Sequence, residues 1–404
     1  MSLKTAPAQL TAGDAELRGQ YLREVLALLY PTSPAGTTGQ ASTEYLVIPD
    51  ARRPKLLVPM GSRRVAIAAV RRFTEPQSRM ARLKRDAVVL ALRSGTWPAL
   101  LRDRVRCSSA DSIDTYLKSA IGQDLRVSVH IGPARANRKP VLQLLNATGD
   151  TLGFAKLGTG PLTRRLVRSE TAALQALSHV KLSRVTVPTV LHAGQWHGHQ
   201  VLVQSPLPIW LPRIPLTSSR LQQAMLEIAG ACGHTQGWLA TSAYWAELRS
   251  RLSQVTDQED GAALNTAARR LVEHCSDLGL RYGAWHGDWA PWNMASTPDA
   301  LLVWDWERFT PGVPLGFDAL HHDLQWRLQS GVDPREAVEQ TIRNAGGLLS
   351  PFEVVPDSAE ITALLYLVDL AARYLADRQA EAGARLGVLG TWLLPVLVER
   401  VGRL

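Results

Sequence analysis

The sequence has little cysteine and no long apolar run. Its 404 residues include only three cysteines, Cys107, Cys232 and Cys275, which lie far apart and form no Cys-x-x-Cys pair. Such scattered cysteines exclude a disulfide scaffold and show no metal-ligand spacing, so we expect reduced thiols. No apolar run reaches the ~18 residues of a membrane-spanning helix, and no secretory signal is visible at the N-terminus. We therefore expect a cytoplasmic protein.

Charge is distributed unevenly along the chain. Hydrophobic residues make up 46% of the sequence and charged residues 20%, as in globular proteins with sizeable cores. The net charge is +9, but residues 51–106 contain 15 Lys and Arg against 3 Asp and Glu, whereas residues 208–404 contain 16 against 23. The basic segment favours a phosphate-rich or anionic partner, and the acidic C-terminal half favours a cationic one.

Hydrophobic periodicity indicates four segments that differ in their predicted secondary structure. A helix at 14–29 precedes a linker rich in Pro, Thr and Gly at 31–40. Two basic helices, at 63–73 and 78–94, follow a hairpin-like stretch at 45–58. Short strands then surround one helix, and the chain is mostly helical after Pro208. The predicted units are 1–43 (helix and linker), 44–123 (basic accessory region), 124–207 and 208–404.

Two neighbouring motifs contain the groups that phosphoryl transfer needs. His286-Gly287-Asp288 is followed by Asn293, and an apolar run twelve residues further on ends in Asp305-Trp306-Glu307. In phosphoryl transfer one Asp accepts or orients the proton of the attacking hydroxyl, while carboxamide and carboxylate oxygens hold Mg²⁺. The spacing of the two motifs makes their combination far more specific than either alone.

This pair of motifs resembles the aminoglycoside phosphotransferase and choline kinase-like family, which shares the protein-kinase fold. The resemblance implies that Asp288 is the catalytic base and that Asn293 and Asp305 bind Mg²⁺. It also implies that Glu307 contacts a second Mg²⁺, directly or through water.

The same resemblance implies a nucleotide site upstream of these motifs. Lys156, on the third of three short strands, would contact the α- and β-phosphates of ATP as a point charge. Glu170, fourteen residues later on a helix, would pair with Lys156. Gly132 lies in the stretch 128–139, where the family has its phosphate-covering loop, and is the only glycine there, unlike the Gly-rich loop of protein kinases. The hinge, whose backbone would bond adenine, is expected at Gln204, Ser205 and Leu207.

Several residues near the motifs leave alternatives open. Tryptophans crowd the motif region, either as packing or as a cation–π surface at Trp289 or Trp292 for an ammonium-bearing acceptor. Asp318 is interpreted as structural, tying the catalytic loop in place. The adjacent His321 and His322 point about 100° apart on a helix and are interpreted as solvated or capping residues.

The basic segment 51–106 also has more than one interpretation. It could be a solvated face of an accessory region, a contact with an anionic membrane surface through the helix at 78–94, or a docking site for an acidic partner. Nucleic-acid binding is disfavoured, because Phe73 is the only Phe or Tyr available for stacking and no recognised motif is present.

Together these features predict an α+β, bilobal protein-kinase-like fold, with a small antiparallel-sheet N-lobe, a large helical C-lobe and an N-terminal accessory region. The predicted function is ATP- and Mg²⁺-dependent transfer of the γ-phosphoryl group to a hydroxyl of a small molecule, such as an aminoglycoside, amino alcohol, sugar or biosynthetic intermediate. The alternatives are a Ser/Thr kinase of a peptide or protein, and a non-catalytic nucleotide-binding protein whose basic region contacts membrane or nucleic acid.

Overall fold

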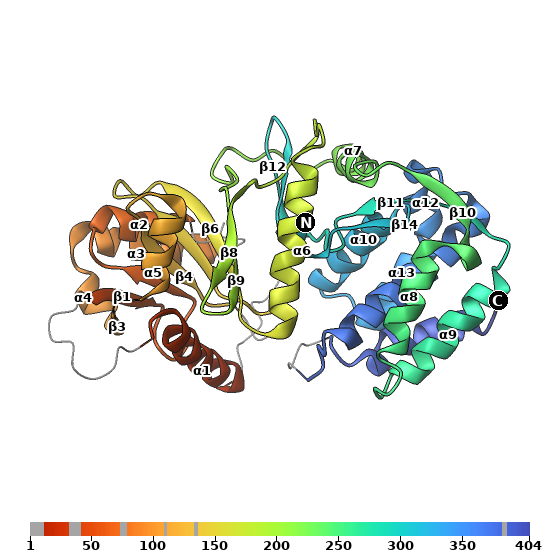
Figure 1. Cartoon of the computed structure of the whole chain (residues 1–404), viewed down its shortest axis with the longest axis horizontal. Coiled ribbons are helices and arrows are strands. Elements are labelled where there is room, and N and C mark those ends of the chain that lie inside the picture. Colours follow the sequence, from red (N-terminus) through yellow and green to blue (C-terminus); the bar gives the residue numbers. More distant parts are fainter. Residues whose placement is uncertain (1–11, 32–41, 73–78, 109–110, 133–135, 382–385) are drawn as a thin grey trace. The chain divides into compact units, whose positions relative to one another are not determined.

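The protein is described by a computed structural model, which forms two compact units. The described residues up to 171, with 188–210, form one unit (the sheet unit); residues 172–187 and 211–404 form the other (the helical unit). Figure 1 shows the elements of both units. Most of the linker predicted at 31–40, and Phe73, lie outside the described residues. These residues are 12–31, 42–72, 79–108, 111–132, 136–381 and 386–404.

An eight-stranded sheet organises the sheet unit, and every strand pair in it is antiparallel. Its order is β3-β1-β2-β4-β5-β6-β9-β8. Strands from both sides of residue 124 share this sheet, because β2 pairs with β4 through Leu56 and His130. The strands are β1 (Ser42–Ile48), β2 (Leu56–Pro59), β3 (Arg104–Ser108), β4 (Arg126–His130), β5 (Val141–Leu145), β6 (Thr151–Gly158), β8 (Val190–Trp196) and β9 (His199–Gln204).

Apolar side chains of β1 point alternately to the two faces of the sheet, so helices pack on both faces at this end. Successive side chains of a strand point to opposite faces. Tyr45 and Val47 join one apolar core, whereas Leu46 joins a second core with residues of α2 and α3. All three side chains are fully buried as a result. The helices of this part of the chain are α1 (Ala12–Leu29), α2 (Arg63–Arg72), α3 (Arg79–Ser94), α4 (Trp97–Leu100), α5 (Ile113–Ile121) and α6 (Pro161–Leu177), the last of which spans the boundary between the units.

The helical unit is built around α13 (Pro356–Ala376), a helix that is apolar on nearly all sides and therefore buried. The other helices are α7 (Ser218–Ala229), α8 (Ala243–Ser253), α9 (Gly261–His274), α10 (Phe317–Gln329), α11 (Pro334–Arg343), α12 (Ala345–Leu349) and α14 (Leu393–Val401). Within the described residues, no helix has the length and apolar character needed to cross a membrane.

Two small three-stranded sheets complete the helical unit. Their orders are β10-β11-β14 and β12-β13-β7. β10 and β14 were absent from the sequence prediction, because both are short and β14 contains two prolines. The predicted α+β class, with an antiparallel sheet followed by a mostly helical part, is confirmed. The strands are β7 (Val185–Thr186), β10 (Thr235–Trp238), β11 (Gly279–Trp285), β12 (Met294–Ser296), β13 (Leu301–Val303) and β14 (Thr310–Pro314).

Candidate active site

The loop after β11 is held in shape by a carboxylate from α10. Asp318 Oδ2 accepts a hydrogen bond from the backbone N–H of His286 at 2.7 Å, and its Oδ1 accepts one from Gly287 at 3.1 Å. Gly287 has a φ of +81°, and a Cβ at this position would collide with the carbonyl oxygen of Arg308. Only glycine fits here. The structural interpretation of Asp318 is confirmed by these contacts.

The carboxylate of Asp288 is held at both oxygens. Asn293 Nδ2 donates to Oδ2 at 2.9 Å and also to the backbone carbonyl of Asp288 at 2.9 Å. His321 Nε2 donates to Oδ1 at 3.1 Å. Burial raises the pKa of Asp288, but the hydrogen bond from His321 and the charge of Arg373 outweigh burial and bring the pKa below its ordinary value. Asp288 is therefore ionised at neutral pH, and its side chain keeps 33% of its surface exposed.

His321 is a residue of the candidate site that the sequence analysis missed. It is 1% exposed, so the interpretation of His321 as a solvated or capping residue is wrong. Because an ionised carboxylate can only accept hydrogen bonds, His321 Nε2 must carry a proton. Burial lowers the pKa of His321, so the ring is neutral, and its Nδ1 accepts a hydrogen bond from the Tyr366 hydroxyl at 3.0 Å. The resulting chain runs from Tyr366 through His321 to Asp288.

His286 joins the loop after β11 to the segment that contains Asp305. Its Nδ1 accepts a hydrogen bond from the backbone N–H of Asp288, and its Nε2 donates to the carbonyl oxygen of Trp304, both at 3.1 Å. Both ring nitrogens are occupied in the neutral form, and a second proton on Nδ1 would point at an N–H group. Burial lowers the pKa of His286 to about 4.

We expect the helical unit to lose stability on acidification because of His286. An unfolded histidine binds a proton near pH 6.5, whereas folded His286 does so only near pH 4, so the free energy of unfolding falls as the pH drops through this window. The expected loss is about 3 kcal/mol. Urea unfolding of the full chain at pH 7.5, 6.0 and 4.5 measures it, with His286→Gln as the non-titrating variant. The exposed His274 provides the control, His274→Gln; an equal pH dependence in all three proteins would contradict the assignment.

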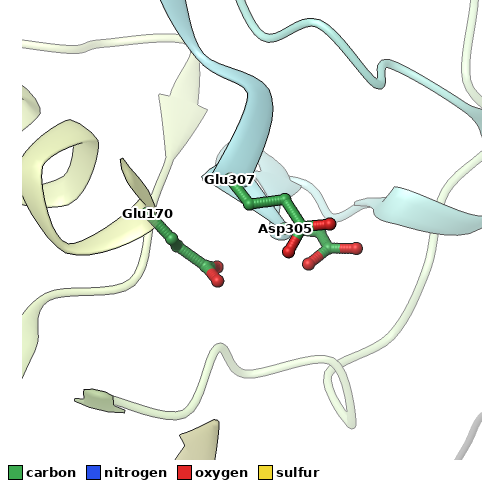
Figure 2. Close-up of side chains that lie close together, drawn as sticks. All are labelled: Glu170, Asp305 and Glu307. Carbon is green, nitrogen blue, oxygen red and sulfur yellow. The ribbon is translucent and has the colours of Figure 1, made fainter. Parts of the chain in front are cut away.

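Asp305 and Glu307 supply a pair of adjacent carboxylates after β13. Each offers an oxygen within 4.8 Å of the other, and Figure 2 shows the two side chains next to one another. Asp305 has a φ of +75°, and the following residues form a short 3₁₀-helix that contains Glu307, which is 5% exposed. The backbone N–H of Trp304 donates to the carbonyl oxygen of Asn293 at 3.1 Å, so the two predicted motifs are in contact.

The oxygen ligands of this region suit Mg²⁺. Mg²⁺ prefers hard oxygen donors and binds through one or two carboxylates. Asp305 and Glu307 provide carboxylates, and the Nδ2 of Asn293 is directed at Asp288, which leaves its amide oxygen as the group available to a metal. The donor set therefore fits the expected ion.

Lys156 and Glu170 form a buried ion pair in the sheet unit. Lys156 Nζ, from β6, lies 2.5 and 2.8 Å from the carboxylate oxygens of Glu170, from α6. Their side chains are 7% and 0% exposed. The pairing expected from the sequence is present, and Glu170 is also labelled in Figure 2.

The remaining predicted nucleotide residues lie at the ends of strands in the same unit. Gly132 follows β4, Gln204 ends β9, and Leu207 is buried shortly afterwards. The backbone N–H of Ser205 donates to the carbonyl of Thr189 at 2.8 Å, so Ser205 could offer a ligand its carbonyl oxygen but not this N–H group.

The tryptophans of the motif region are mostly packing residues. Trp285, Trp289 and Trp306 are between 0% and 4% exposed. Trp289 is therefore excluded as a surface for an ammonium group, whereas Trp292 is only half-buried. His286 packs edge-on against Trp306, with ring centroids 4.5 Å apart.

No family model and no curated protein matches the chain. Solved structures do. A thermostable mutant of aminoglycoside phosphotransferase APH(4)-Ia, in complex with ADP and hygromycin B, is 14% identical over 72% of this chain and 98% of that one, with a TM-score of 0.46. Choline kinase LicA from Streptococcus pneumoniae is 17% identical over 72% and 99%, with a TM-score of 0.45. Spectinomycin phosphotransferase APH(9)-Ia is 12% identical over 72% and 98%, with a TM-score of 0.41.

The fold is protein-kinase-like. The third of three consecutive antiparallel strands contains Lys156, the next helix contains Glu170, and two further strands precede most of the helical unit. In that unit the loop with Asp288 and Asn293 is followed by a two-stranded hairpin and Asp305. This order of elements and groups is the one predicted from the resemblance to aminoglycoside phosphotransferases and choline kinases.

Proposed function

We propose that the protein is an ATP- and Mg²⁺-dependent phosphotransferase that moves the γ-phosphoryl group to a hydroxyl of a small molecule. The observation that supports this most strongly is the pair of hydrogen bonds that orients the carboxylate of Asp288. Its carboxylate is hydrogen-bonded by Asn293 and His321 and lies within electrostatic reach of Asp305. A general base needs this combination of charge, orientation and partial exposure.

In the proposed reaction Asp288 accepts a hydrogen bond from the acceptor hydroxyl and takes its proton as the oxygen attacks the γ-phosphorus. The bond between the γ-phosphorus and the bridging oxygen breaks, so that ADP leaves and a phosphate ester forms. Asn293, Asp305 and Glu307 would hold the metal, which supplies neutralisation of phosphate charge. Lys156 would contact the α- and β-phosphates, with Glu170 fixing its direction. Most of the catalysis then comes from positioning.

Tyr366 and His321 act in this proposal as positioning residues. The hydroxyl of Tyr366 fixes the tautomer of His321, and the Nε2–H of His321 fixes the rotation of the Asp288 carboxylate and favours its ionised form. His321→Asn is expected to lower kcat roughly 10- to 100-fold with little change in the KM for ATP. In the native protein the hydrogen bond from His321 lowers the pKa of Asp288. Its loss in the variant should raise this pKa, so the acidic limb of the kcat–pH profile should move to higher pH.

Two further variants separate positioning from general damage. Tyr366→Phe removes only the donor to Nδ1 and should shift the same limb by a smaller amount. His322→Asn changes the adjacent, half-buried histidine and should leave the pH profile unchanged. Equal pH profiles for His321→Asn and the native protein would show that His321 has no part in setting the charge of Asp288.

The acceptor class is open to a direct test. The excess of acidic residues in 208–404 favours an acceptor that carries an amine. We would measure ADP release with ATP and Mg²⁺ against aminoglycosides, spectinomycin, choline, ethanolamine, hexoses, macrolides and a mixture of Ser/Thr peptides, with Asp288→Asn as the blank. Release stimulated by one small-molecule class and absent from the blank is the expected result. Stimulation by peptides alone would indicate a protein kinase, and failure to bind ATP would overturn the proposal.

A further inference from the structure

Helix α3 exposes an unusual amount of apolar surface. Met80, Leu83 and Leu90 are 61%, 64% and 65% exposed, and no other large apolar side chain in the described part of the chain exceeds 59%. All three belong to one helix of sixteen residues. Single exposed apolar side chains are ordinary on protein surfaces, but a group of them on one element marks an interaction site.

The exposed apolar residues of α3 form one stripe. At about 100° per residue, Met80, Leu83, Ala87 and Leu90 fall within an arc of about 80°. The opposite side of the helix is fixed, because Val89 and Leu92 are buried in the core that α3 shares with α2 and the sheet. The stripe is therefore held outwards by the packing of α3.

Cationic side chains flank this stripe. Lys84 lies on one side of it, and Arg82 and Arg93 lie on the other; all three are exposed. The acidic residue of α3, Asp86, lies 3.2 Å from the cation of Arg85.

The positive surface continues beyond α3. Arg63, Arg64 and Arg71 of the neighbouring helix α2 are exposed as well. The pKa of Lys55 is lowered by burial and by the charges of Arg18 and Lys84. Cations from separate elements therefore contribute to the same positive surface.

We propose that the exposed side of α3 docks on an anionic lipid surface. Met80, Leu83 and Leu90 would enter the boundary between headgroups and acyl chains, while Arg82, Lys84 and Arg93 remain at the level of the anionic headgroups. A lipid surface supplies apolar and anionic chemistry side by side along the whole stripe. An acidic protein would need a groove shaped to the convex surface of α3, with apolar side chains along its floor and acidic side chains along its edges. This inference is independent of the proposed phosphotransferase function.

Vesicle flotation of the full-length protein tests the inference. With vesicles of phosphatidylcholine and 30% phosphatidylserine in 50 mM salt, we expect binding that falls at least tenfold in pure phosphatidylcholine. The triple variant Met80→Ser, Leu83→Ser, Leu90→Ser should lose at least tenfold in affinity. Arg82→Glu with Lys84→Glu should lose as much, and binding of the native chain should weaken in 500 mM salt.

A matched control replaces exposed apolar side chains elsewhere. Trp238, Val355 and Val388 are 50–59% exposed, and their replacement by Ser should leave vesicle binding unchanged. Circular dichroism and ATP binding of each variant report its folding. Absence of vesicle binding by the native chain, or binding that the α3 variants leave intact, would overturn the inference. Binding to an acidic polypeptide that competes with vesicles only through the cations, with no effect of the apolar triple variant, would also overturn it.

Discussion

Asp288→Asn is expected to lower kcat by about 10²- to 10⁴-fold while ATP binding stays close to that of the native protein. The Asn side chain has nearly the same shape and can still accept a hydrogen bond from Asn293, but its amide cannot take a proton from the acceptor hydroxyl. Single-turnover phosphoryl transfer measures the chemical step, and calorimetric titration with ATP and Mg²⁺ measures binding.

The control for this variant is Asp299→Asn. Asp299 is an exposed aspartate of the helical unit, and its replacement changes the net charge by the same amount. It should leave both turnover and binding unchanged. If Asp288→Asn abolished ATP binding together with turnover, the carboxylate would be part of the nucleotide or metal site, and the assignment of Asp288 as the base would fail.

Lys156→Met should cost the sheet unit about 3–5 kcal/mol of unfolding free energy. Lys156 and Glu170 are 7% and 0% exposed, so loss of the cation leaves the charge of a fully buried carboxylate without that of Lys156. The double variant Lys156→Met, Glu170→Leu removes both charges and should recover much of this stability. Under the proposed function both variants should lose phosphoryl transfer, because neither contains the cation proposed to contact the phosphates. Urea unfolding followed by fluorescence, with activity measured in parallel, separates the two effects.

An exposed ion pair of the same unit gives the comparison. Lys118 lies 2.8 Å from Asp124, but the two side chains are 41% and 63% exposed. Lys118→Met should therefore cost less than about 1 kcal/mol. A loss of stability in Lys156→Met no larger than that in Lys118→Met would mean that Glu170 is well solvated without Lys156.

The sequence identified the residues that stand in short, ordered motifs. Asp288 and Asn293 are five residues apart, so local chain geometry alone brings them together, and the apolar strand before Asp305 positions the second carboxylate. His321 was missed because it lies 33 residues from Asp288 in the sequence, and only the fold brings the two side chains together. One signal was available: His321 follows Asp318 by three residues, which places both on the face of α10 that meets the catalytic loop.

Non-local strand pairing was also beyond the sequence pattern. The hairpin-like stretch at 45–58 was recognised, but its partner β4 lies some 70 residues further along the chain. Alternate side chains of β1 enter two different cores, but in the sequence β1 is a continuous apolar run. Such a run is the pattern expected of a strand with helices on both faces of its sheet. Trp289 could not be assigned to packing from the sequence, because a tryptophan in a loop fits either a buried or an exposed position.

The pairing of β2 with β4 bears on whether the N-terminal segment can be removed from this protein. A segment that is joined to a domain only by a linker can be removed or exchanged without disturbing that domain. Here its removal would strip the neighbour from β4 and leave that strand as an open edge, ready to pair with another chain. The N-terminal strands and β4 therefore form one structural unit, and a shortened chain that begins at residue 124 would have to protect the edge of β4 in another way.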